Sequence, residues 1–208
     1  MAANLRKVTD YVLLRSSYMR EVGLFHGKMG VVISLYAYAK KYDDPLLEEY
    51  AWDLFQQVYD GVHTDMPVGM EYGLAGIGYG TTLLQKAHFI DCDLNAVLAD
   101  VDSKIMERDP RRMTDLTLRT GAAGLRMYLS FRQSVQQPLL SFDSRYVEEL
   151  QSRLRDEASC GVAAELIDII DEPSFSVEEY IDKSISIDGG SSYYILKDTL
   201  YDKHFHIQ

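Results

Sequence analysis

Cysteine and basic residues are scarce in this sequence. The 208 residues include two cysteines, which excludes a disulfide scaffold and a zinc site made of four cysteines. Lys and Arg number 21 against 32 Asp and Glu, and the formal net charge of -11 disfavours binding to nucleic acid or to an anionic membrane. No apolar run approaches the ~20 residues of a membrane span, and the Arg- and Lys-containing start does not resemble a secretory signal. We therefore expect a cytoplasmic protein with no nucleic-acid partner and no membrane span.

Glycine is concentrated in three short elements that recur along the chain. Each element has two glycines three residues apart: Gly27 and Gly30, Gly73 and Gly76, and Gly121 and Gly124. The first glycines are 46 and 48 residues apart, and each pair leads into an apolar stretch. Between these stretches lie segments with the i, i+3, i+4, i+7 apolar spacing of helices that bury one face. The repeating unit is therefore an αα-hairpin with an apolar inner helix and an amphipathic outer helix.

Acidic residues mark the starts of the predicted outer helices. Asp44 precedes Pro45, while Asp93 and Asp143 stand at the corresponding places in the second and third repeats. Asp is a favoured N-cap, and proline is tolerated in the first helical turn. We expect helix boundaries at these positions.

The paired glycines need a physical reason, because glycine inside a helix costs about 1 kcal/mol relative to alanine. Residues three apart share a helix face, so each pair is expected to form a notch for the backbone of a neighbouring inner helix. His26, Tyr72 and Thr120 directly precede the first glycines. We expect these three side chains at the helix N-termini, where unpaired N–H groups favour polar or anionic ligands.

The three inner-helix starts resemble those of the lanthionine synthetase C-like (LanC-like) family: GLFHGKMGVVISLYAYA, GMEYGLAGIGYGTTLL and LTLRTGAAGLRMYLS. The resemblance covers residues 21–157, and Phe25 to Gly30 is similar to the histidine-glycine-x-x-glycine signature of that family. It implies an α/α toroid fold and a role in the modification of ribosomally made peptides. Active members of the family close thioether rings with a zinc ion held by two cysteines and a histidine.

This chain departs from the family at the zinc ligands. Cys92 falls in an outer-helix cap, Cys160 precedes Gly161 without an adjacent histidine, and the only tryptophan, Trp52, lies on an outer helix. We therefore expect no zinc, no other cofactor and no zinc-dependent cyclase activity.

The predicted fold is all-α, a single domain over residues 1–208 in which αα-hairpins form a partial α/α toroid. The repeats span about 21–60, 67–108 and 115–157, and residues 158–208 are a degenerate C-terminal part. Helices are expected near 162–170 and 177–184. The glycines at 189–190 fit a short β-hairpin or a degenerate fourth inner helix, and the second interpretation is favoured. Because an arc leaves its terminal helix faces uncovered, a homodimer is expected.

Four residues are candidates for catalysis, and four are candidates for binding. The catalytic candidates are His26, Asp65, Glu71 and Asp115, and the binding candidates are His26, Tyr72, Arg119 and Thr120. His26 suits either proton transfer or a hydrogen bond to a neighbouring inner helix. Asp65 and Glu71 suit proton transfer with a nearby histidine, or they are ordinary polar loop residues. Asp115 is expected to orient Arg119 toward an anionic ligand or to form a structural ion pair with it.

Arginine is enriched in one part of this acidic chain. Residues 111–155 carry eight arginines and four acidic residues. This band suits docking of an acidic peptide or of the protein's own tail, and it equally suits solvation of outer helices.

Three functions are compatible with these features. The first is a LanC-like, non-catalytic binding or scaffolding subunit in peptide modification. The second is an α/α-toroid carbohydrate-active enzyme that uses pairs of Asp and Glu. The third is a helical-repeat module that binds a peptide.

Overall fold

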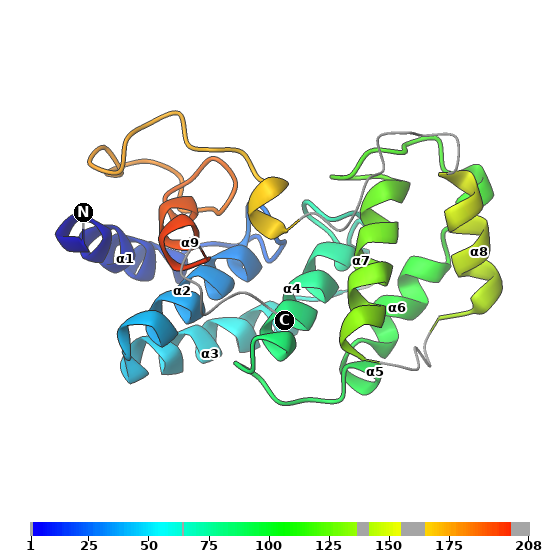
Figure 1. Ribbon diagram of the computed structural model, residues 1–208, viewed down its shortest axis with the longest axis horizontal. Coiled ribbons are helices and arrows are strands. Elements are labelled where there is room, and N and C mark those ends of the chain that lie inside the picture. The colour runs from blue at the N-terminus through cyan, green and yellow to red at the C-terminus, as the bar shows by residue number, and fades with distance from the viewer. Residues whose placement is uncertain (1, 64, 137–141, 155–164, 201–208) are drawn as a thin grey trace. The chain divides into compact units, whose positions relative to one another are not determined.

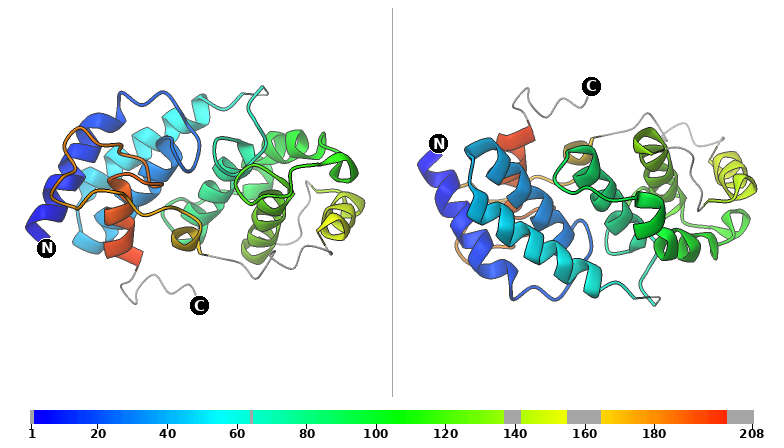
Figure 2. Two further views of the ribbon diagram at one scale, coloured as in Figure 1. Left: turned by 90° about the horizontal axis from the view of Figure 1, so that it is seen from above. Right: turned by 90° about the horizontal axis from the view of Figure 1, so that it is seen from below.

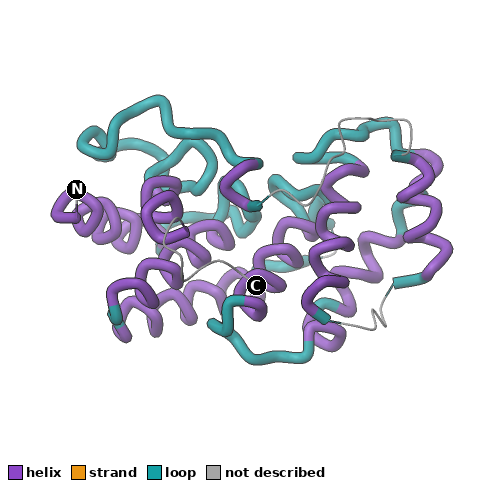
Figure 3. The backbone as a smooth tube through the Cα atoms, viewed as in Figure 1, coloured by secondary structure: helices purple, strands orange, loops and turns teal. Residues whose placement is uncertain are grey.

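The computed structural model describes residues 2–63, 65–136, 142–154 and 165–200. These residues form α-helices, two short 3-10 helices and connecting loops, and no strand occurs among them (Figures 1 and 3). The prediction of an all-α protein is confirmed. Within the described ranges, no helix has both the length and the apolar character that crossing a membrane requires.

The chain divides into two compact units. The first unit combines Met1–Val62 with Glu165–Gln208, and the second unit is the continuous segment His63–Ala164. Each of the three predicted hairpins supplies its inner and outer helices to a single unit.

Helix α2 (Lys28–Tyr42) is the centre of the first unit. It packs against α3 (Pro45–Asp60), α9 (Ser192–Leu200) and α1 (Ala2–Ser16). Every residue of α2 from Lys28 to Ala39 is buried, as expected for a helix that is apolar on all sides. The outer helix α3 buries one face, formed by Leu47, Ala51, Leu54, Phe55 and Val58.

The second unit has two inner helices that pack on each other. They are α4 (Leu74–Lys86) and α7 (Ala122–Val135). The outer helix of this hairpin is split into α5 (Leu94–Val97) and α6 (Ala99–Met106), and α6 packs on α4. Helix α8 (Ser144–Arg153) packs on α7 and on the 3-10 helix η1 (Pro110–Arg112).

The predicted acidic caps are confirmed. The Asp44 carboxylate accepts a hydrogen bond from the backbone N–H of Leu47, and Pro45 is the first residue of α3. Asp93 caps α5 and Asp143 caps α8 in the same way. These caps satisfy N–H groups that have no partner within the helix.

The C-terminal part differs in places from the sequence prediction. Residues after Gly190 form the helix α9, as favoured, and not a β-hairpin. The expected helix over 177–184 is wrong: this segment forms isolated turns, with Asp182 in the left-handed region at φ 58°. Of the helix expected over 162–170, residues 162–164 lie outside the described ranges, and the remainder contains only the 3-10 helix η2 (Leu166–Asp168).

The position of helix α9 bears on the expectation that the terminal helices of the arc leave their apolar faces uncovered. Helix α9 lies against α2 and α1, so the last inner helix covers the first one within a single chain (Figure 2). This expectation is therefore wrong for the first unit, where α2 and α9 cover each other.

Candidate binding site at the helix starts

Four loops, one before each inner helix, are closed by the same backbone hydrogen bond. These helix-start loops are residues 21–27, 67–73, 115–121 and 184–190, and the helices that follow the first three begin after Gly27, Gly73 and Gly121. In each, the residue after the last glycine donates its N–H to the carbonyl seven residues earlier: Lys28 to Glu21, Leu74 to Pro67, Ala122 to Asp115 and Ser191 to Ser184, at 2.9, 2.9, 3.0 and 2.8 Å. The described ranges therefore contain four loops with this closing hydrogen bond.

The fourth loop has only part of the glycine signal. Gly190 takes the place of Gly27, but Tyr193 stands where the earlier repeats have their second glycine. Its distance of 69 residues from Gly121 also differs from the spacings of 46 and 48. The shared element is the loop with its closing glycine, and the second glycine is dispensable.

The structural reason for the first glycine differs from the one predicted. A Cβ added at Gly73 would lie well under 3.0 Å from backbone atoms of Pro67 and Gly69, which belong to its own loop. Gly27 has the same relation to Gly23 in the first loop. The first glycine therefore makes room for the preceding loop, which turns back over the helix start, and not for a neighbouring helix.

The second glycines make room for two partners. A Cβ at Gly30 would overlap the Leu24 carbonyl of its own loop and would lie 2.7 Å from Ile187 Cγ1 of another repeat. A Cβ at Gly124 would overlap its own loop and would lie 2.7 Å from Met70 Cγ. The prediction that the notch holds the backbone of a neighbouring inner helix is therefore wrong at Gly30 and Gly124, where loop side chains of another repeat lie in this space.

The loops are joined in pairs by one more backbone bond. In the first unit, Asp188 donates its N–H to the Phe25 carbonyl at 3.2 Å. In the second unit, Glu71 donates its N–H to the Arg119 carbonyl at 2.9 Å. All four residues stand two positions before the closing glycine of their loop, so the two units use the same joint between two repeats.

Each joint also carries a carboxylate and a basic side chain. His26 Nε2 lies 3.2 Å from Asp188 Oδ2, and Arg119 Nη1 lies 3.4 Å from Glu71 Oε1. The carboxylates are the more buried partners, since the Asp188 and Glu71 side chains are 5% and 14% exposed, against 32% for His26 and 31% for Arg119. In both joints, a more buried carboxylate therefore holds a more exposed basic side chain.

Asp115 does not orient Arg119, contrary to one sequence expectation. Its carboxylate accepts hydrogen bonds from the Thr117 N–H at 2.9 Å, the Thr117 hydroxyl at 2.7 Å and the Thr120 hydroxyl at 2.6 Å. These hydrogen bonds, that from Thr120 foremost, lower the pKa of Asp115. The Asp115 carboxylate therefore stabilises the loop to which it belongs. Arg119 forms its ion pair with Glu71.

Asp115→Asn should make protein stability less dependent on pH. A native carboxylate with a lowered pKa contributes stability that is fully present above the ordinary Asp pKa of about 3.9 and is lost as the pH falls through the lower native pKa. We expect the wild-type Tm to exceed that of the variant near neutral pH, and the difference to shrink in acid. Scanning calorimetry across this range measures it, and a difference that does not change with pH contradicts the assignment.

The remaining predicted residues are exposed. Tyr72 and Thr120, each directly before a closing glycine, reach solvent, as does Asp65. The structure thus joins Glu71 with Arg119 and Asp115 with Thr120. Glu71 and Asp115, two of the carboxylates considered for glycoside hydrolysis, therefore each have a partner within the second unit.

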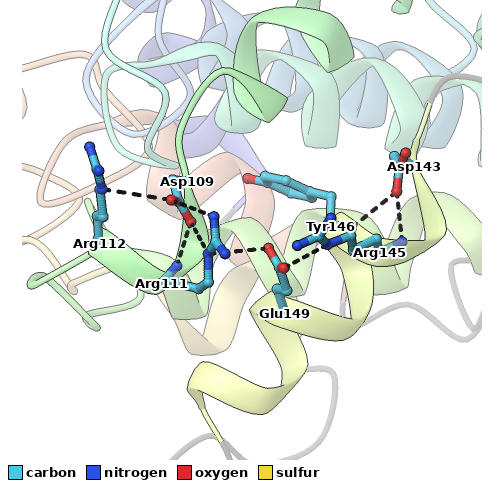
Figure 4. Close-up of polar contacts among 7 residues, drawn as sticks. All are labelled: Asp109, Arg111, Arg112, Asp143, Arg145, Tyr146 and Glu149. Atoms are coloured by element: carbon cyan, nitrogen blue, oxygen red, sulfur yellow. Dashed lines mark hydrogen bonds and ion pairs between the residues drawn. The ribbon is translucent and has the colours of Figure 1, made fainter.

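Several arginines of the band form ion pairs or hydrogen bonds within the second unit, and Figure 4 shows those of Arg111 and Arg145. Arg111 binds Asp109 at 2.9 Å and approaches Glu149, which also binds Arg145 at 3.0 Å. Arg153 donates two hydrogen bonds to the Met113 carbonyl, and Arg132 is fully buried. Arg155 lies outside the described ranges. The band is therefore largely a set of internal bonds that hold η1 and α8 together.

Cys92 is one of the two cysteines that were compared above with the zinc ligands of the LanC-like family. It is half-buried, and burial raises its pKa. A zinc ligand is a thiolate, which is favoured by a lowered pKa. The other cysteine, Cys160, lies outside the described ranges.

One pocket of about 450 Å³ adjoins the third helix-start loop. It is lined by Val68, Glu107, Arg108, Asp109, Arg112, Met113, Thr114, Asp115, Thr120, Gly121 and Leu125. Asp115 and Thr120 were singled out by the sequence. Arg112 belongs to the arginine band over residues 111–155, whereas Arg108 was missed, because nothing in its sequence pattern indicates that the segment after α6 folds toward this loop.

Comparison with known proteins gives no relative. No family model, no curated protein and no solved structure matches the chain.

Proposed function

We propose that this protein is a LanC-like, non-catalytic helical-repeat protein that holds a peptide for modification by a separate enzyme. The supporting observation is the fourfold helix-start loop, which presents side chains such as His26, Tyr72 and Thr120 beside the N-termini of the inner helices. Polar side chains and helix N-termini together suit the polar backbone of an extended peptide.

The partners of the carboxylates and the lowered pKa of Asp115 favour a binding function over acid–base catalysis. Glu71 and Asp188 are each paired with a basic side chain, and hydrogen bonds lower the pKa of Asp115. A general acid near neutral pH needs a raised pKa, as in glycoside hydrolases. The raised pKa of Cys92 likewise gives no support for thiolate–zinc chemistry.

The proposal can be tested by selecting binders from a displayed library of random short peptides on the immobilised full chain. We expect selected peptides to bind the wild type and to bind Tyr72→Ala about tenfold more weakly, the loss typical of an exposed aromatic anchor. Tyr59→Ala is the matched control, because Tyr59 is an exposed tyrosine on the outer helix α3.

Two outcomes would contradict this proposal. One is the absence of any enriched peptide, and the other is equal loss of binding in both tyrosine variants. Elemental analysis of the purified protein adds an independent check, because zinc retained at one ion per chain would favour an active cyclase over a binding subunit.

The toroid and the homodimer belong to the same proposal. In an α/α toroid, α2, α4, α7 and α9 would be the inner helices of one ring, and a compact 208-residue chain has a radius of gyration of about 17 Å. Small-angle scattering combined with light scattering measures this radius together with the mass, which is 23.7 kDa for one chain. A clearly larger radius at the mass of one chain contradicts the ring. The mass of one chain contradicts the dimer and leaves the peptide-binding proposal intact.

A further inference from the structure

We infer that the pocket beside η1 in the second unit binds an acidic peptide segment that carries an apolar side chain. This inference rests on the proposed peptide-binding function and gives it a place and a ligand chemistry. The argument depends on which groups of the pocket are already paired within the protein.

The inner surface of the pocket is apolar in part. Val68, Met113 and Leu125 contribute hydrocarbon, and Leu125 is buried while the other two are half-buried. The volume of about 450 Å³ falls within the range of roughly 300–1,000 Å³ that is typical of ligand sites. An apolar side chain of a ligand would be removed from water here.

The three carboxylates that line the pocket are already engaged. Glu107 binds Lys104 at 2.7 Å, and Asp109 accepts two hydrogen bonds from Arg111 at 2.9 and 3.0 Å. The Asp115 carboxylate is taken by the threonines of its own loop. Glu107 and Asp109 are therefore ion-paired within the protein, and Asp115 is held by hydrogen bonds within its own loop.

The two arginines that line the pocket are not engaged in this way. Arg112 is 89% exposed, and its ion pair with Asp109 is long at 3.8 Å. Figure 4 shows its terminal nitrogens pointing away from Asp109. Arg108 is exposed, and its side chain makes no hydrogen bond or ion pair with other residues in the described part of the chain. The pocket thus presents two available guanidinium groups beside an apolar surface.

Guanidinium groups select carboxylates by geometry as well as by charge. Their N–H groups form a planar fork that binds a carboxylate through two parallel hydrogen bonds. A ligand that joins carboxylates to an apolar side chain therefore matches the pocket. A nucleic acid would match the arginines but not the apolar surface, and the net charge of -11 opposes it.

A neighbouring pocket shows the contrasting case. It has a volume of about 360 Å³ and is also lined by charged residues, among them Arg111, Arg145 and Glu149. These groups bind one another (Figure 4). Since its arginines are already paired with acids, this second pocket has much less to offer an acidic ligand.

The experiment measures binding of a fluorescein-labelled peptide of alternating Glu and Leu to the full chain by fluorescence anisotropy. Arg108→Glu combined with Arg112→Glu should weaken binding at least about tenfold, because two charge-assisted bonds become repulsive. The control combines Lys7→Glu with Arg20→Glu, which changes the net charge equally at exposed positions outside the pocket. Circular dichroism confirms that each variant is folded. A third variant, Val68→Gln, should weaken binding severalfold through loss of the apolar surface.

Each other outcome would overturn the inference. It is wrong if the pocket variant and the control bind alike, if a Lys–Leu peptide binds as well as the Glu–Leu peptide, or if the Glu–Leu peptide does not bind. Displacement of the peptide by inorganic phosphate or by single-stranded DNA at equal concentration would identify a general anion site instead. If library peptides are selected but one of these results is obtained, the assignment of the binding site to this pocket is refuted and the proposed function stands. If no library peptide is selected, the proposed function itself is refuted.

Discussion

Gly73→Ala is expected to lower the free energy of unfolding by about 3 kcal/mol, at the upper end of the usual cost of overpacking. The added Cβ would overlap the Pro67 carbonyl and lie 2.8 Å from the Gly69 carbonyl oxygen. Both obstacles are backbone, so a change of rotamer cannot relieve the overlap. The loop has to move away, which breaks the hydrogen bond from Leu74 to Pro67 that closes it.

Urea unfolding followed by circular dichroism measures this loss. For a protein of this size it corresponds to a fall in Tm of roughly 10 °C. Gly189→Ala is the control, because a Cβ there has no atom within 4 Å and the substitution meets only the cost of φ +63°, about 1 kcal/mol. Equal losses in the two variants would mean that the closing glycine is not set by the close approach of its loop.

Asp102→Ala is expected to destabilise the second unit by about 3–5 kcal/mol, the usual cost of leaving a buried charge without its partner. The side chains of Asp102, Tyr128 and Arg132 are fully buried. The Tyr128 hydroxyl donates to Asp102 at 2.5 Å, and an Arg132 nitrogen lies 3.8 Å from the other carboxylate oxygen. Burial, followed by the effect of the Asp102 carboxylate, raises the pKa of Tyr128 well above its ordinary value. The hydroxyl therefore stays protonated and continues to donate.

Arg132 makes this loss severe. Its Nη2 atom donates to Asn95 at 3.2 Å, but Nε and Nη1 have no hydrogen-bond partner within the described ranges. In Asp102→Ala, the buried Arg132 guanidinium would keep only the hydrogen bond to the neutral Asn95 side chain and would lose the carboxylate that balances its charge.

A double-mutant cycle with Arg132→Met tests this explanation. Asp102→Leu combined with Arg132→Met should cost clearly less than the sum of the single changes, because the pair is removed together. Additive losses would show that the two charges do not stabilise each other. Asp10→Ala is the surface control and should have little effect, since its ion pair with Arg6 is exposed and such pairs contribute little.

The sequence predicted the parts of the fold that depend on local pattern. The apolar period located the helices, and acidic caps such as Asp44 and Asp143 located helix starts, because each cap bonds N–H groups only a few residues away. The break between α5 and α6 at Leu98 was missed, since the apolar spacing continues through it. Asp182 in a left-handed turn likewise interrupts a segment with no proline or glycine to signal the change.

The candidate site was only partly predictable, because its partners are distant in sequence. Arg119 was assigned to Asp115, four residues away, but the joint between loops brings it to Glu71. His26 was expected either to transfer protons or to bond a neighbouring inner helix, and its partner Asp188 lies in the loop before α9. Such pairings follow from how repeats are joined, which a single sequence does not specify.

The composition of the first unit has a consequence for biosynthesis. Helices α1, α2 and α3 lie near the start of the chain, but α9, which packs on α2, consists of residues 192–200. The second unit is continuous over 63–164 and has all of its residues before α9 is translated. Because domains fold as units during synthesis, the second unit would be able to fold before α9, which packs on α2, has been synthesised. The part of the protein that is made first is thus the last to reach its native packing, and until then its apolar surface is available to chaperones.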